Sequence, residues 1–160
     1  MRMIVAAVGK LKHGPERELF EHYWQRLEAA GRSVSFSPLR LDELNEGRAA
    51  TADLRKADEA QRLLRTSGEA DVRIVLDEHG KRLDSAALAA WIKSRRDGGA
   101  KTMAFLIGGP DGHGAEMLAS ATLGLSLGPM TLPHGLARIV LAEQLYRAAT
   151  IISGHPYHRA

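Results

Sequence analysis

Short apolar runs alternate with longer amphipathic segments along this chain of 160 residues. The runs are rich in β-branched and other apolar residues, a pattern typical of buried strands. We expect strands at residues 3–8, 34–39, 72–76, 103–107 and 125–127. Between them, apolar residues recur three or four positions apart, which is the spacing of one face of a helix. This spacing predicts helices at residues 16–30, 52–66, 85–96, 115–121 and 136–152.

The order of these segments predicts the fold class. Strands that alternate with helices are typical of an α/β protein with a mostly parallel sheet flanked by helices. The length is that of one domain, residues 1–160. We expect Thr51 to cap the second helix, and Asp84 or Ser85 to cap the third. The polar segment 42–47 predicts a mobile loop.

The last predicted helix is apolar on more than one face, which indicates burial on both sides. The second side can be covered by a partner subunit or by the rest of the same domain, and periodicity does not separate the two. Glu143 and Arg147 stand four positions apart, in the order that favours an ion pair along a helix. The apolar positions are Leu136, Ile139, Val140, Leu141, Leu145, Tyr146, Ala149 and Ile152.

Composition and charge narrow the class. Hydrophobic residues make up 44% and charged residues 26% of the chain, as in soluble proteins. The sequence has no membrane-length apolar run and no secretory signal. The absence of cysteine excludes disulfides and thiolate metal sites and fits a cytoplasmic protein. The net charge of +3 is compatible with nucleic-acid binding, but it is small, and there is no long basic run. Any contact with a nucleic acid must therefore use a shaped surface.

Three predicted strands end in residues that suit a ligand site. Ligands of parallel sheets bind beyond the carboxyl ends of the strands, and these ends are Leu76-Asp77, Ile107-Gly108-Gly109 and Leu127-Gly128. The turn at residues 108–112 lacks the dinucleotide and Walker patterns, so it is either a ligand-contacting turn or simply a tight turn. Residues 127–132 combine apolar side chains with backbone amides, and form either a slot for an adenine ring or a core loop.

The chain ends in groups that bind ligands or transfer protons, from His155 to Arg159. The spacing of His155 and His158 is compatible with a metal, but Pro156 disfavours a regular helix and no third ligand stands nearby, so we expect no metal. The segment is either a surface tail or a tail that packs against a ligand cleft. In a cleft, histidine can move a proton, arginine can bind phosphate and tyrosine can stack on a base.

Several motifs together resemble one family. They are Phe105-Leu-Ile-Gly-Gly-Pro-Asp-Gly112, Met130-Thr-Leu-Pro-His134, Leu141-Ala-Glu-Gln-Leu-Tyr-Arg147 and His155-Pro-Tyr-His-Arg159. They resemble the ribosomal RNA large subunit methyltransferase H family, the pseudouridine N3-methyltransferases of the SPOUT class. Ile4-Val-Ala-Ala-Val-Gly9 and Val75-Leu-Asp-Glu-His-Gly-Lys81 extend the resemblance over the whole chain. Asp111 replaces the Glu of many members, and Gly128-Pro129 also differs from the common loop; both changes are conservative for a turn.

The resemblance implies an enzyme that uses S-adenosylmethionine to methylate N3 of pseudouridine 1915 in 23S rRNA of the large ribosomal subunit. It also implies a homodimer and a C-terminal trefoil knot, which physical reasoning alone would reject because knots are rare. The implied cofactor site consists of Leu76, Gly108, Gly109, Leu127, Gly128, Pro129, Met130, Thr131 and Leu132.

Roles for the tail follow from the same resemblance. His158 is expected to take the N3 proton, Arg159 to hold a phosphate or the developing anion of the base, and Tyr157 to position the base. We expect Arg147, His134 and His155 to contact RNA or support the tail. Two other functions remain open: a nucleotide-binding protein and a non-catalytic RNA-binding module.

Overall fold

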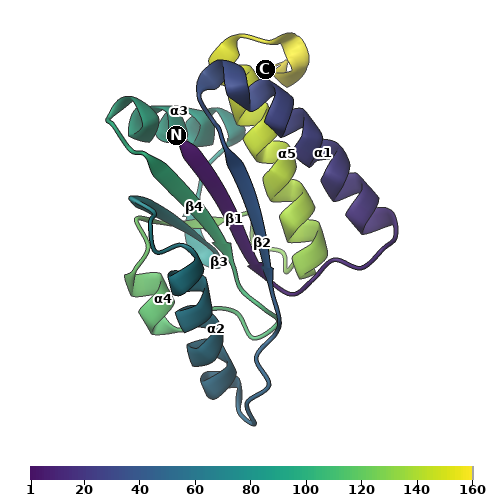
Figure 1. Ribbon diagram of the computed structural model, residues 1–160, viewed down its shortest axis with the longest axis vertical. Helices are drawn as coiled ribbons and strands as arrows, with labels where there is room; N and C mark the ends of the chain where they lie inside the picture. Colours follow the sequence, from purple (N-terminus) through teal and green to yellow (C-terminus); the bar gives the residue numbers. More distant parts are fainter. Residues whose placement is uncertain (160) are drawn as a thin grey trace.

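A five-stranded sheet forms the centre of the computed structural model, which describes residues 1–159 (Figure 1). The strands are β1 (Arg2–Val8), β2 (Leu39–Leu44), β3 (Val72–Arg82), β4 (Thr102–Ile107) and β5 (Leu123–Ser126). Their order is β2-β1-β4-β3-β5, and every neighbouring pair is parallel. The predicted α/β class with a parallel sheet is therefore confirmed.

Helices cover both faces of the sheet. They are α1 (Pro15–Gly31), α2 (Ala52–Thr66), α3 (Ser85–Asp97), α4 (Ala115–Ala119) and α5 (His134–Ser153), with short 3-10 helices η1 (Arg32–Val34) and η2 (Pro156–His158). The predicted caps are confirmed: the Thr51 hydroxyl accepts from the Leu54 amide, and the Asp84 carboxylate accepts from the Ala87 amide. Each cap satisfies an amide that the first helical turn leaves free.

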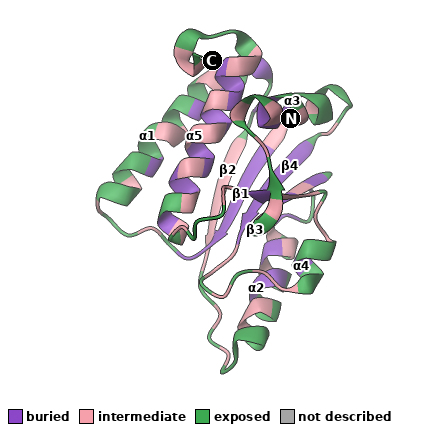
Figure 2. Ribbon diagram, turned by 180° about the vertical axis from the view of Figure 1, so that it is seen from behind, coloured by how far each residue is buried: buried purple, intermediate pink, exposed green. Residues whose placement is uncertain are grey.

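Strand β1 shows how one sequence pattern builds two cores. Because successive side chains of a strand point to opposite faces, Met3, Val5 and Ala7 pack with α1, α3 and α5, while Ile4, Ala6 and Val8 pack with α2 and α4. Figure 2 shows the result, with a buried central sheet and exposed residues on the outer sides of the helices. A strand that is covered on both faces explains the unbroken apolar run near the N-terminus.

The prediction of a strand at residues 34–39 is wrong. Residues 32–34 form η1, and β2 begins only at Leu39 and runs to Leu44, through part of the predicted loop 42–47. Val34 and Phe36 are buried, but as irregular chain that packs against the core. The polar residues of β2 belong to an edge strand and are only partly buried, and distant arginines neutralise Glu43. These arginines are far from Glu43 in the sequence, so the residues around β2 alone do not indicate a strand there.

The apolar surface of helix α5 is buried mainly by the rest of its own domain. It lies beside α1 against the sheet (Figure 1), and Leu141, Leu145 and Ala149 are fully buried within the single chain. Packing within the monomer core therefore explains why these three positions are apolar, without a partner subunit. Leu136, on the first turn, remains 41% exposed.

No helix within residues 1–159 has both the length and the hydropathy that a membrane span requires. The trefoil knot stays a prediction from the family resemblance.

Candidate functional site

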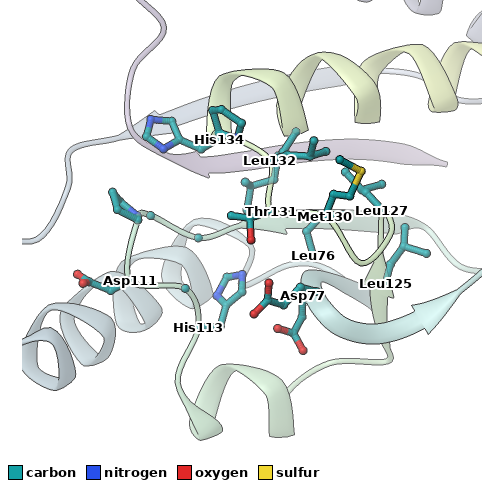
Figure 3. A pocket seen from close by; sticks show the side chains of 18 of the residues that line it. Leu76, Asp77, Asp111, His113, Leu125, Leu127, Met130, Thr131, Leu132 and His134 are labelled. Carbon is teal, nitrogen blue, oxygen red and sulfur yellow. The ribbon is translucent and has the colours of Figure 1, made fainter.

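A cavity of about 730 Å³ opens at the carboxyl ends of β4 and β5 and beside residues 76–78 of β3, which continues to Arg82 beyond its predicted end (Figure 3). Its size is that of a pocket for a small organic ligand. Three loops and the first turn of α5 form its walls. The lining residues are Leu76, Asp77, Glu78, Ile107, Gly108, Gly109, Pro110, Asp111, Gly112, His113, Leu125, Leu127, Gly128, Met130, Thr131, Leu132, Pro133, His134 and Ala137.

The structure brings together nearly the whole predicted cofactor set. Leu76, Gly108, Gly109, Leu127, Gly128, Met130, Thr131 and Leu132 all line the cavity. Pro129, in the same loop, is not among the lining residues. His134, which we expected to support RNA or the tail, instead lies at the cavity where α5 begins.

In the turn after β4, the side on which Gly108 and Gly109 lack a Cβ atom is packed against other residues of the protein. A Cβ atom at Gly108 would lie 3.0 Å from the His113 ring, and one at Gly109 would lie 3.1 Å from both Glu59 and Val8. The turn closes through a 3.0 Å hydrogen bond from the Gly112 amide to the Gly109 carbonyl. Packing beneath the cavity therefore explains these glycines, beside the approach of a ligand that the sequence suggested.

An irregularity in β3 places two carboxylates at the cavity. Leu76 and Lys81 both pair with Leu125 of β5, so the intervening residues loop out of register and carry Asp77 and Glu78 to the cavity wall. The close passage of β3 over β5 requires Gly80, because a Cβ atom there would be only 2.6 Å from the Gly124 backbone. The strand-end signal at Asp77 was visible in the sequence, whereas the outward loop was not.

The cavity has acidic groups and, among its lining residues, neither Lys nor Arg. The carboxylate of Asp111 is held by Arg55, whose hydrogen bond keeps the pKa of Asp111 below its ordinary value. Asp77 and Glu78 leave the site anionic, so it favours a neutral or cationic ligand over a polyphosphate. This argues against the nucleotide-binding alternative.

His113 is a lining residue that the sequence analysis missed. Burial lowers its pKa, although the nearby Asp77 carboxylate opposes that shift, so the imidazole is neutral at neutral pH. Its Nε2 atom is buried and has no hydrogen-bond partner among residues 1–159. Figure 3 shows Asp77, His113 and Thr131 turned toward the same part of the cavity. Asp77 comes from the irregular part of β3, and His113 and Thr131 come from the loops after β4 and β5, which is why no local motif marks them.

The predicted catalytic tail packs along the C-terminal half of α5, from Glu143 onward. The Tyr157 hydroxyl donates to Glu143 Oε1 at 3.0 Å, and the Tyr157 ring lies 4.5 Å from that of Tyr146. Burial, with the hydrogen bond to Glu143, raises the pKa of Tyr157 to about 12. Arg147 donates to the same Glu143 oxygen at 2.7 and 3.0 Å and lies over the Tyr157 ring. Arg147 thus forms the helix pair that its spacing predicted.

The remaining tail residues differ in exposure. His155 Nδ1 accepts from the Tyr157 amide at 3.2 Å, which starts η2. His158 is partly buried, and its Nδ1 atom is buried without a partner in the described chain. Arg159 is exposed.

Cavity and tail stand at opposite ends of α5. The helix has 20 residues, so its length is about 30 Å at the usual rise per residue. Tyr157 reaches back only to Glu143, in the middle of the helix, and none of Tyr157, His158 and Arg159 lines the cavity of its own chain. Across residues 1–159, no three His, Asp or Glu side chains are grouped as a metal site would require.

Comparisons with known proteins agree with this geometry. A family model described as "Predicted SPOUT methyltransferase" matches residues 1–158. A protein of Brucella anthropi named ribosomal RNA large subunit methyltransferase H is 49% identical over 160 residues, with both chains covered completely. Its namesake from Sinorhizobium fredii is 48% identical, again over the full length of both. A probable methylase family protein of Haemophilus influenzae shares the fold with a TM-score of 0.55 at 8% identity, over 99% of this chain and 70% of the other. The chain therefore belongs to the SPOUT methyltransferase family.

Proposed function

We propose that this methyltransferase transfers the methyl group of S-adenosylmethionine to N3 of pseudouridine 1915 in 23S rRNA of the large ribosomal subunit. The observation that carries the proposal is the anionic, largely apolar cavity beside β3, β4 and β5, in a chain whose full-length relatives are named for the large-subunit RNA. The same relatives support action in the cytoplasm. The substrate is free 23S rRNA, the large subunit or the assembled ribosome.

The cavity suits S-adenosylmethionine in shape and charge. Leu76, Leu127 and Leu132 offer apolar surface for the adenine ring, and the loop after β5 offers backbone groups for its edge. Asp77 and Glu78 would favour the cationic end of the molecule, since opposite charges attract most strongly in a partly desolvated site. A neutral His113 adds no positive charge that would repel the sulfonium.

When bound, the sulfonium supplies an activated methyl group whose leaving group is a neutral thioether. The methyl carbon forms a bond to N3 as the bond to sulfur breaks, and the N3 proton must leave. The chain's task is to align the two reactants and accept that proton. In this proposal His158 takes the proton, Tyr157 positions the base and Arg159 holds a phosphate or the anionic base. Arg147, His134 and His155 would contact RNA or support the tail.

Such a site needs a second copy of the chain. The tail follows the last turn of α5, the cavity lies at the first turn, and none of Tyr157, His158 and Arg159 lines the cavity of its own chain. A homodimer with its α5 helices antiparallel would bring the tail of one copy to the cavity of the other. Leu136, exposed beside the cavity, is suited to that contact.

The cofactor part is tested by titration with S-adenosylmethionine and, separately, with ATP. We expect binding of the first without added metal and none of the second. Binding of ATP alone would support the nucleotide-binding alternative. Loss of the N3 methyl group from 23S rRNA in cells that lack the protein, measured by mass spectrometry, tests the substrate. Cofactor binding with an unchanged RNA would contradict this substrate.

The shared site is tested by mixing two inactive variants. Leu127→Trp should fill the cavity, and deletion of residues 157–160 should remove the tail. A mixed dimer contains one intact cavity facing one intact tail, so co-refolded protein should regain methylation. No recovery, with mixed dimers demonstrated by mass, would refute the shared site. Light scattering that shows a wild-type monomer at micromolar concentration would do the same.

A further inference from the structure

One arginine outside the cavity is bonded to part of the cavity wall. Arg55 of α2 grips Asp111 with two hydrogen bonds, Nε to Oδ2 at 2.7 Å and Nη2 to Oδ1 at 3.2 Å. Its third nitrogen, Nη1, donates to the Ala49 carbonyl at 3.0 Å. All three guanidinium nitrogens therefore have partners, which fixes the orientation of the group.

The wall itself has few other attachments. Pro110, Asp111, Gly112 and His113 line the cavity in sequence. Within the described chain, the hydrogen bonds of residues 110–112 are the one from the Gly112 amide to the Gly109 carbonyl and the two from Arg55. Gly112 has a φ of 77°, a conformation that glycine adopts readily. A loop with so few bonds depends strongly on each of them.

Helix α2 also supports this wall from below. Glu59 is 3% exposed, accepts from the Gly47 amide at 2.8 Å and packs under Gly109. Gly47 lies directly on the backbone of Arg55, where a Cβ atom would be 3.2 Å away. The helix is thus in contact with the loop after β2 and with the loop after β4, and Arg55 is the residue bonded to both.

We propose that Arg55 is a positioning residue of the cofactor site, which acts through Asp111 to hold the 110–113 wall in its binding conformation. The proposal rests on the proposed function in one respect, that S-adenosylmethionine occupies this cavity. The alternative is an ordinary surface ion pair, since the Arg55 and Asp111 side chains are 31% and 24% exposed. Such pairs commonly contribute little, and that alternative predicts no change in the cavity.

The first measurement needs no cofactor. In Arg55→Ala, hydrogen exchange at the Gly112 amide should be faster than in the wild type, because the loop opens more often. Arg55→Lys should recover only part of the protection, since an ammonium cannot bind the carboxylate with two nitrogens. Unchanged exchange in Arg55→Ala would overturn the proposal, whatever the protein binds.

The second measurement is calorimetric titration with S-adenosylmethionine. Arg55→Ala and Asp111→Ala should each raise the Kd about tenfold, and the double variant should be no weaker than either single one, because both remove the same pair. Faster exchange with a Kd within about twofold of the wild type would overturn the positioning role. A wild type that binds no S-adenosylmethionine would refute the proposed function, while the exchange result would still decide the role of Arg55 in the wall.

Arg62→Ala is the matched control. Arg62 lies on the same helix, pairs with Asp58 at 3.0 Å and donates to the Asn45 carbonyl at 2.6 Å, but makes no hydrogen bond to residues 109–113. Its loss should leave Gly112 exchange and the Kd unchanged. Equal weakening in Arg62→Ala would show that any damage to α2 suffices, and would also overturn the specific role of Arg55.

Discussion

We expect replacement of Glu43, on the edge strand β2, to lower the free energy of unfolding strongly. Its Oε2 atom accepts from Arg138 Nη1 and from the Leu11 amide, each at 2.8 Å, and its Oε1 atom accepts from Arg17 Nη1 at 2.7 Å. Arg138 has 0% exposure, and within residues 1–159 its other hydrogen bond goes to the Gly9 carbonyl at 3.0 Å. Glu43→Ala would therefore leave a buried guanidinium without its counter-charge.

The magnitude follows from that burial. Removing one partner of a buried ion pair costs about 3–5 kcal/mol, because the other charge stays desolvated and uncompensated. Arg138→Met should cost less, since Glu43 keeps Arg17 and the Leu11 amide. The double variant should be more stable than Glu43→Ala alone, because no orphaned charge remains.

Urea unfolding near neutral pH measures these differences from the midpoint and slope of each transition. A free energy of unfolding for Glu43→Ala within about 1 kcal/mol of the wild type would refute the reasoning. So would strictly additive losses in the double variant, since the two residues would then not be coupled.

The pH dependence gives an independent check on Glu43. Burial alone would raise its pKa, but the hydrogen bonds from Arg17 and Leu11 and the charges of both arginines outweigh it, so the pKa lies below 4.5. The stabilisation is therefore present above pH 4.5 and lost as the pH falls through the folded-state value. Glu43→Gln, which cannot ionise, should lack this component of acid unfolding. An unchanged acid profile would contradict it.

Three further results are expected. His113→Phe should remove a loss of thermal stability as the pH falls below 6.5, because burial lowers the pKa of His113 and only the unfolded chain then takes up the proton; an identical pH profile would contradict this. Deletion of residues 157–160 should cost about 1–2 kcal/mol in urea unfolding through the lost Tyr157 contacts, and should keep cofactor binding but abolish methylation; full activity would refute a catalytic tail. Leu127→Trp should fold normally and bind no S-adenosylmethionine in a calorimetric titration; unchanged binding would place the cofactor elsewhere.

Sequence patterns were sufficient where burial is decided locally. The strand in residues 3–8 and the helix at residues 52–66 could be predicted because their apolar spacing and, for the helix, the Thr51 cap are continuous in the chain. Strand β2 could not, because Glu43 is tolerated there only through Arg17 and Arg138, 26 and 95 positions away. Apolar Val34 and Phe36 misled the prediction, since they bury their side chains without joining the sheet.

The candidate site shows the same division. Strand ends and glycine-rich turns identified most of the cavity wall, because parallel strands direct their carboxyl ends to one edge. His113 carried no signal, since its role depends on a ring that packs beneath Gly108 and faces the outward loop of β3. The tail motif and the long helix before it could both be predicted, but only the structure shows that the cavity lies at the first turn of that helix while the tail follows its last turn.

Because α5 is one continuous helix, its length sets the spacing between the cavity at its first turn and the tail after its last turn. In the proposed dimer, the separation between a chain's cavity and its tail equals the separation that the partner must match in the opposite direction. Each residue of a helix advances the chain about 1.5 Å and turns it about 100°. Inserting a single residue in α5 would therefore shift and rotate His158 relative to the partner's cavity, and in a symmetric dimer this would happen at both sites. Spacing within α5, and not only the identity of its residues, becomes part of the enzyme's specificity.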